Sequence, residues 1–218
     1  KKMKVDIKEF ANKNLKWIIL FLCLIGFIAL AEDVFNKEIM KGDIIGYNII
    51  SYFISDTVTP IAKFITSFGG TICLLLIATI LFIVIKNKKI GIAIWINLII
   101  ATIMNVILKG LLQRPRPNEY RIINENGYSF PSGHSMISMA FYGFLIYLIY
   151  KYVKNKYLKW TLITLLGILI MLIGISRIYL GVHYTSDVIA GFLISISYLI
   201  IYVGIIKKFL TRENYPHK

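Results

Sequence analysis

The segment Ile90–Leu112, IGIAIWINLIIATIMNVILKGLL, sets the fold class of this chain. Its only charged residue is Lys109, near its end, and its length is close to the roughly 20 residues that a helix needs to cross the hydrocarbon of a bilayer. The whole chain shares this character, since 57% of its 218 residues are hydrophobic and its mean hydropathy is +0.71. This composition predicts one integral membrane domain over residues 1–218, with no room for a second sizeable soluble domain.

Further apolar runs of near-spanning length flank this segment. They are Leu15–Ala31, Ile65–Ile85, Ser135–Val153, Trp160–Leu180 and Val188–Ile206. Together the runs predict an all-α, polytopic membrane protein with six transmembrane helices.

The chain before the second run carries a helical pattern of its own. Val58, Ile61, Ile65 and Phe68 recur at helical spacing, which predicts an amphipathic helix at the membrane interface between the first two spans. A simple lead-in to the second span is the alternative. In the first span, Ala29-Leu30-Ala31 resembles a signal-peptidase site, but the apolar stretch is long for a cleaved signal and favours a retained helix.

Basic residues are distributed unevenly between the two sides of these spans. The two ends of the chain, Lys86–Lys89 and Lys151–Lys159 together hold 17 lysines and arginines, whereas the connections on the other side hold 8. By the positive-inside rule, tails 1–14 and 208–218 are cytoplasmic and the other connections face outward. The net charge of +14 is therefore explained by membrane topology, and no nucleic-acid partner is expected. Cys23 and Cys73 lie in apolar runs and indicate neither a disulfide framework nor a metal site.

Charged residues gather at the outer ends of the predicted helices. Lys109, Arg116 and Arg177 lie there, and lysine and arginine side chains are the usual partners of phosphate oxygens. Taken singly, Lys109 and Arg116 are better explained as side chains that extend toward lipid headgroups. Arg114 has a weaker claim to the site, and headgroup contact is the expectation for it.

Two histidine-containing segments lie at the same level. Pro131-Ser132-Gly133-His134 has the form of a helix start, with Ser132 as N-cap, and a helix N-terminus is a ready anion site. His183-x3-Asp187 places a carboxylate where it can orient an imidazole and leave the other ring nitrogen as nucleophile or base. The neighbouring cations favour an anionic ligand over a metal ion. His217, in the tail, has no such neighbours in sequence and is expected to be solvated.

Taken together, these segments resemble the three-part signature of the type 2 phosphatidic acid phosphatase superfamily. The matching residues are Lys109-x6-Arg116-Pro117, then Pro131-Ser132-Gly133-His134, then Ser176-Arg177-x5-His183-x3-Asp187. Every signature position is filled and in order, and the signature covers about half of the chain.

The resemblance implies a role for each signature residue. His183 is expected to attack phosphorus and form a phosphohistidine, Asp187 to support it, and His134 to protonate the leaving oxygen and then activate water. Lys109, Arg116 and Arg177, with Ser132 and the Gly133 backbone N–H, are expected to bind the phosphate. The family resemblance implies no metal and no cofactor.

The expected function is hydrolysis of a lipid phosphate at the outer face of a bacterial plasma membrane. Undecaprenyl pyrophosphate, phosphatidylglycerophosphate and phosphatidic acid are the candidate substrates, and oligomeric state is left open. A phosphotransferase using the same site is the alternative. A transporter or a non-catalytic binding protein is less favoured, because transporters usually place polar groups near the bilayer midplane.

Overall fold

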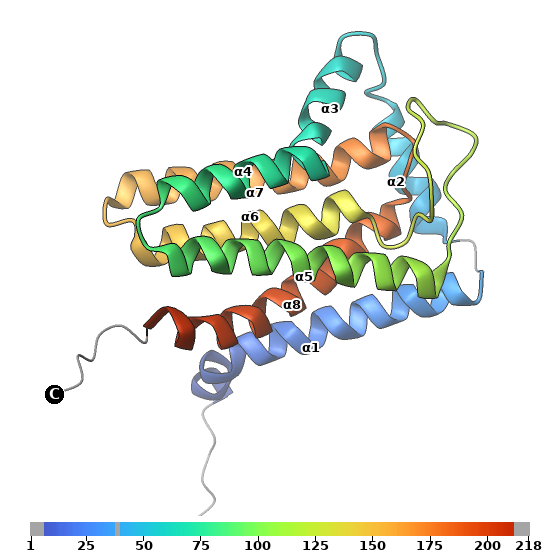
Figure 1. Cartoon of the computed structure of the whole chain (residues 1–218). Coiled ribbons are helices and arrows are strands. Elements are labelled where there is room, and N and C mark those ends of the chain that lie inside the picture. The colour runs from blue at the N-terminus through green and yellow to red at the C-terminus, as the bar shows by residue number, and fades with distance from the viewer. Residues whose placement is uncertain (1–6, 38–39, 212–218) are drawn as a thin grey trace, which may run out of the picture.

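The computed structural model describes residues 7–37 and 40–211, and these residues form eight α-helices and no strand. The predicted all-α class is confirmed. The helices are α1 Ile7–Phe35, α2 Lys41–Ser51, α3 Val58–Ser67, α4 Thr71–Val84, α5 Lys88–Leu112, α6 Gly133–Tyr152, α7 Lys156–Tyr179 and α8 Thr185–Thr211 (Figure 1).

Five of these helices, α1, α5, α6, α7 and α8, are long and apolar enough to cross a membrane. A sixth span exists only if α3 and α4 are counted together, and they meet at a bend of 49°. The prediction of a continuous helix over Ile65–Ile85 is therefore wrong. The chain breaks at Gly69 and Gly70, where a Cβ on Gly69 would lie 2.7 Å from Ile173 Cγ2, so the glycine lets this backbone approach α7 closely.

Other boundaries also differ from the sequence-based expectation. The predicted helix near Val58 is present as α3, but α2 was not anticipated. Helix α1 already begins at Ile7 and α8 continues to Thr211, so both helices extend beyond the apolar runs from which they were predicted. Residues 1–6 and 212–218, including His217, lie outside the described part of the chain.

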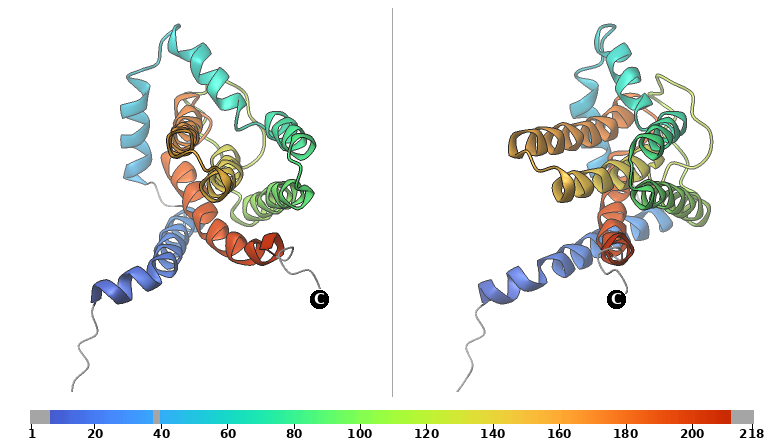
Figure 2. Two further views of the ribbon diagram at one scale, coloured as in Figure 1. Left: turned by 90° about the vertical axis from the view of Figure 1, so that its left-hand side faces the viewer. Right: turned by 60° about the vertical axis from the view of Figure 1, so that its left-hand side comes forward.

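Helix α6 lies at the centre of the bundle and packs against α5, α7 and α8, while α1 packs on α8 (Figures 1 and 2). Its inward face buries Phe141 and Phe144, and the Phe144 ring packs edge-on against Tyr202 of α8. Large apolar side chains on the outer surface are instead exposed, among them Ile72, Ile83 and Leu111, as expected of helices that face lipid.

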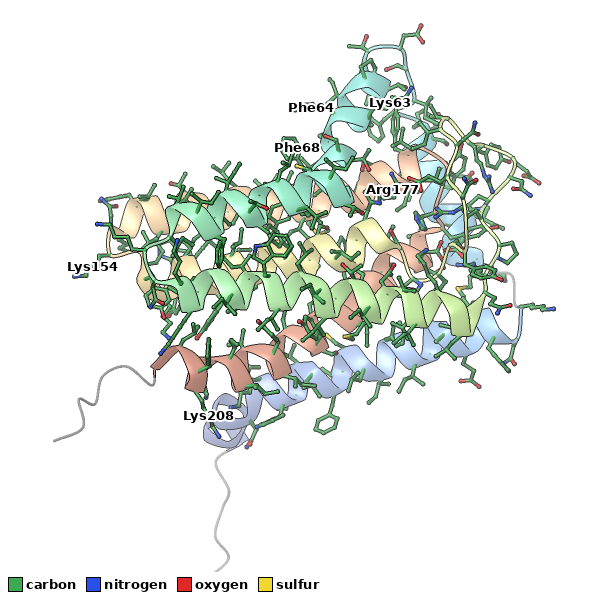
Figure 3. The ribbon with its side chains drawn as sticks, viewed as in Figure 1. Lys63, Phe64, Phe68, Lys154, Arg177 and Lys208 are labelled. Atoms are coloured by element: carbon green, nitrogen blue, oxygen red, sulfur yellow. The ribbon has the colours of Figure 1, made fainter. Side chains whose placement is uncertain are left out.

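The connections that carry the polar segments all gather at one end of the bundle. Helices α2 and α3 pack against α7 at this end, beside the long connection 113–132. Figure 3 shows Arg177 here and Lys154 and Lys208 at the opposite end. The fold thus separates the phosphatase-like segments from the lysine-rich connections.

Candidate active site

The predicted site residues lie at four helix ends and in the adjoining connections, which hold Arg116 and His183. Lys109 lies in the last turn of α5, and Arg177 lies in the last turn of α7. Ser132 and His134 stand at the start of α6, while Asp187 is in the first turn of α8. His183 lies within hydrogen-bonding distance of both Asp187 and Arg116, and Glu125 lies between Arg116 and Arg177, so the tertiary structure brings these predicted residues together.

His183 is held in one tautomer by two neighbours. Its Nδ1 lies 3.3 Å from Asp187 Oδ2, and its Nε2 lies 3.0 Å from an Nη1 of Arg116. An arginine can only donate, so Nε2 accepts and the ring proton lies on Nδ1, facing the carboxylate. The Nε2 lone pair is the one that a nucleophilic histidine needs.

Burial keeps this histidine neutral. The His183 side chain is almost fully buried, and burial lowers its pKa to about 4, with Asp187 opposing the shift and Arg177 and Arg116 adding to it. Tyr184 N–H donates to the same Asp187 oxygen at 2.9 Å, so the carboxylate is held by the backbone as well. At neutral pH the imidazole therefore presents an unprotonated nitrogen.

Arg116 also cross-links two segments of the chain through its hydrogen bonds. Its Nε and Nη2 donate to the carbonyls of Gly127 and Asn126 at 3.0 and 3.1 Å, and its Nη1 donates to the carbonyl of Val182 at 3.0 Å. These bonds join the 113–132 connection to the segment that carries His183. Arg116 is thereby fixed next to His183.

Arg177 is 1% exposed and contacts partners that no pattern in the sequence predicts. It donates to Thr66 Oγ1 at 2.9 Å and to Glu125 Oε1 at 2.5 Å, while its Nε has no partner among the described residues. The other oxygen of Glu125 lies 3.7 Å from Arg116. A carboxylate thus lies between two arginines predicted to bind phosphate, and no local motif marks Thr66 or Glu125 in the sequence.

This carboxylate is ionised. Burial alone would raise the pKa of Glu125, but Arg177 and Arg116 more than offset burial and lower it. The pair of arginines therefore already stabilises an anion in this structure.

Helix α6 begins as the sequence predicts. Ser132 is its N-cap, and its hydroxyl accepts from Ser135 N–H at 3.4 Å and from the Ser135 hydroxyl at 3.0 Å. A Cβ on Gly133 would lie 3.0 Å from Asn105 Oδ1, so glycine permits close packing on α5. The Ser132 hydroxyl is fully buried and occupied in capping, and phosphate binding by Ser132 and Gly133 stays a prediction.

Lys109 and His134 border the site from different sides. The Lys109 ammonium donates to the carbonyls of Tyr128 and Ser129 in the long connection. His134 lies against the α3–α4 break, where a Cβ on Gly69 would be 3.1 Å from its Cδ2. The absence of a side chain at Gly69, in the break of the second predicted span, therefore leaves room for the His134 ring.

Arg114 does not extend toward headgroups, as the sequence had suggested. It forms ion pairs with Asp187 at 2.6 Å and with Asp43 of α2 at 2.7 Å, and its side chain is 12% exposed. The expectation is wrong because α2 brings a second carboxylate to this place, and neither α2 nor its contact with α8 could be read from a local pattern. Among the described residues, no three histidine, cysteine or acidic side chains are grouped so as to hold a metal ion.

Comparison with known proteins agrees with this arrangement. The phosphatidylglycerophosphatase B of Bacillus subtilis is 39% identical over 92 residues, which cover 41% of this chain and 45% of that protein. The undecaprenyl-diphosphatase of Sulfolobus acidocaldarius is 31% identical over 217 residues, covering 90% of this chain and 96% of that protein. The match thus spans less than half of the first relative and nearly all of the second.

Solved structures share the fold. The crystal structure of a transmembrane PAP2 type phosphatidylglycerolphosphate phosphatase from Bacillus subtilis matches with a TM-score of 0.78 at 25% identity, over 87% of this chain and 96% of that chain. Aquifex aeolicus LpxE matches in fold with a TM-score of 0.60 at 23% identity, over 72% of this chain and 92% of that chain.

The family model described as the PAP2 superfamily matches residues 90–210, which is more than half of the chain and includes all three polar segments. A family match of this extent agrees with a relative aligned over almost its whole length and with a shared transmembrane fold. This chain therefore belongs to the PAP2 superfamily.

Proposed function

We propose that this protein hydrolyses a phosphate monoester or diphosphate on a membrane lipid, through a phosphohistidine on His183. The observation that carries the proposal is the state of His183: its Nδ1 faces Asp187 and its Nε2 lone pair lies beside Arg116. Buried arginines next to a neutral imidazole provide both the anion site and the nucleophile that phosphoryl transfer requires.

In the first step, Arg116 moves its hydrogen bond from Nε2 of His183 to a phosphoryl oxygen, and the freed Nε2 attacks phosphorus, so that a P–N bond forms as the P–O bond to the lipid breaks. The electron pair of that bond leaves with the lipid oxygen, which takes a proton from His134. A phosphate dianion bound beside His134 favours the protonated imidazole that this step needs. Arg116, Arg177 and Lys109 stabilise the negative charge on the phosphoryl oxygens.

In the second step, neutral His134 takes a proton from water, and the water oxygen attacks the phosphohistidine. The P–N bond breaks, its electron pair returns to Nε2 of His183, and inorganic phosphate leaves. Positioned proton transfer of this kind contributes about 10²- to 10⁴-fold to a rate. Neither step requires a metal or a cofactor.

An apolar groove supports a lipid substrate. It has a volume of about 220 Å³, and Trp95 and Leu98 of α5 and Leu74 of α4 are among the residues that line it. Gly69 lies at the same groove and also packs against His134. A hydrocarbon chain in the groove therefore places its ester oxygen next to the group that protonates it.

The membrane arrangement is part of the proposal. There are six spans: α3 lies at the interface and leads through the bend into α4, which completes the second span. Both tails are cytoplasmic, and the site faces outward. The support is the excess of lysine and arginine at the opposite end of the bundle from Arg177. A site at headgroup level accepts the phosphate of a lipid whose chains stay in the bilayer.

The test is phosphate release by the detergent-purified protein from undecaprenyl pyrophosphate, phosphatidylglycerophosphate and phosphatidic acid, with EDTA present. Labelled substrate should leave an acid-labile, alkali-stable label on the wild type and none on His183→Gln. A protein that releases no phosphate from any of these lipids would overturn the proposal. Loss of activity in EDTA would overturn its metal-free step, and transfer of label to an alcohol instead of water would indicate a phosphotransferase.

A further inference from the structure

A buried ion cluster lies behind Asp187, on the side away from His183. Arg114 donates from Nη1 to Asp187 Oδ1 at 2.6 Å and from Nη2 to Asp43 Oδ2 at 2.7 Å. Its guanidinium carbon lies 3.9 Å from the centre of the Tyr184 ring. A planar fork that binds two carboxylates and stacks on an aromatic ring has little freedom to rotate.

The two oxygens of Asp187 have separate partners. Oδ1 faces Arg114, while Oδ2 accepts from Tyr184 N–H and faces His183 Nδ1. Arg114 therefore fixes the plane of the carboxylate that sets the tautomer of His183.

The charges of the cluster explain why Asp43 is needed. Arg114 alone would neutralise Asp187, and His183 would then face an ion pair with no net charge. Asp43 adds a second carboxylate, so the three side chains together carry one negative charge. Burial alone would lower the pKa of Arg114, but Asp187 and Asp43 raise it, so Arg114 stays charged throughout the working pH range.

Helix α2 is seated so that Asp43 reaches this cluster. Asp43 Oδ1 accepts from Ser186 N–H at 2.7 Å, and its Oδ2 accepts from the Ser186 hydroxyl at 2.9 Å. A Cβ on Gly46, one turn further along α2, would collide with Oγ1 of Thr185, so glycine allows the two helices to approach. Helix α2 thus docks at the first turn of α8, the turn that holds Asp187.

We infer that Arg114 and Asp43 are positioning residues for the His183–Asp187 pair, with Asp43 acting through Arg114. The inference rests on the proposed function, because it assigns their purpose to the same phosphoryl-transfer step. Through these residues, helix α2 contributes to the reaction although it carries no signature residue.

A purely structural role must be separated from this one, because Asp43 also caps the N-terminus of α8. Asp43→Asn keeps an oxygen that can accept from Ser186 N–H while it removes the charge, and Arg114→Lys keeps a charge while it removes the fork. Retention on size exclusion and the thermal midpoint in detergent report folding independently of turnover. Asp56→Asn, which changes an exposed acid between α2 and α3, is the matched control.

The experiment measures phosphate release from the best lipid substrate of the wild type. In variants that stay folded, kcat should fall about 10- to 100-fold for Arg114→Gln and Arg114→Lys and about tenfold for Asp43→Asn, with KM within about threefold of wild type. Asp56→Asn should retain the wild-type kcat.

A double variant tests whether the effect of Asp43 on kcat depends on Arg114. If Asp43 acts through Arg114, then kcat of Asp43→Asn/Arg114→Gln should match that of Arg114→Gln alone, whereas independent effects multiply. A wild-type kcat in folded Arg114→Gln would overturn the inference, and so would multiplying effects in the double variant. An inactive wild type would instead refute the proposed function.

Discussion

Glu125 holds the place between Arg116 and Arg177 where a phosphate is proposed to bind, so Glu125→Gln should increase the affinity for phosphate. In the structure its carboxylate lies 2.5 Å from Arg177 and 3.7 Å from Arg116. A phosphate must displace this carboxylate or share the arginines with it. Its apparent affinity is then reduced by the fraction of molecules in which the arginines are free.

The size of the effect follows from the exposure of the pair. Arg177 is buried but Glu125 is 28% exposed, so the contact lies between a surface ion pair and a fully buried one. A charge-assisted bond exceeds the neutral amide bond that glutamine can retain by about 1 kcal/mol. Since about 1.4 kcal/mol is a factor of ten, the inhibition constant for phosphate should fall about fivefold.

The assay measures competitive inhibition of lipid phosphate hydrolysis by inorganic phosphate at fixed ionic strength, because salt screens such contacts. Phosphorus NMR line broadening gives the affinity without turnover. Glu119→Gln removes a charge from an exposed position of the same connection and serves as the control. An unchanged or higher inhibition constant in Glu125→Gln would refute the competition.

The remaining predictions concern the proposed nucleophile His183, its protonation and the turn at Gly181 that precedes it. His183→Gln should lower kcat at least about 10³-fold while the protein stays in the membrane, measured as phosphate release from purified protein. Because burial lowers the His183 pKa to about 4, its neutral form is lost only as pH falls through about 4. The acid limb of kcat/KM, corrected for ionisation of the substrate, should lie there, and a limb near 6.5 would contradict this. Gly181 has a φ of +68° and a Cβ there would collide with the Tyr120 carbonyl, so Gly181→Val should destabilise the fold by about 2 kcal/mol or more in a detergent melt. Gly110→Ala should not destabilise the fold, because a Cβ added there would meet no side chain or other segment within 4 Å.

The signature residues could be chosen from the sequence because each segment carries its own local pattern. A helix cap at Ser132 depends on its immediate neighbours, and the approach of Asp187 to His183 depends on a four-residue spacing at a helix start. Apolar runs likewise reveal membrane helices. Each spanning segment must pair its own backbone polar groups and be apolar over the width of the hydrocarbon, so the signal lies within the segment itself.

Contacts between distant segments could not be predicted in this way. Thr66 and Glu125 meet Arg177 across the bundle, and the sequence contains no spacing that joins them. The break at Gly69 was missed because the run Ile65–Ile85 was identified by its mean hydropathy, which does not register a bend, although Gly69 and Gly70 interrupt the run near its start.

The apolar runs alone establish an all-α membrane protein, and the phosphatase character comes from the resemblance of three polar segments to a family signature. The pairing of Arg114 with Asp43 and Asp187, and the position of Glu125 between two phosphate-binding candidates, are visible only in the folded molecule. Ion pairs form between side chains that are close in space. The distances between these charged groups depend on how α2, α7 and α8 pack together, which local sequence patterns do not encode.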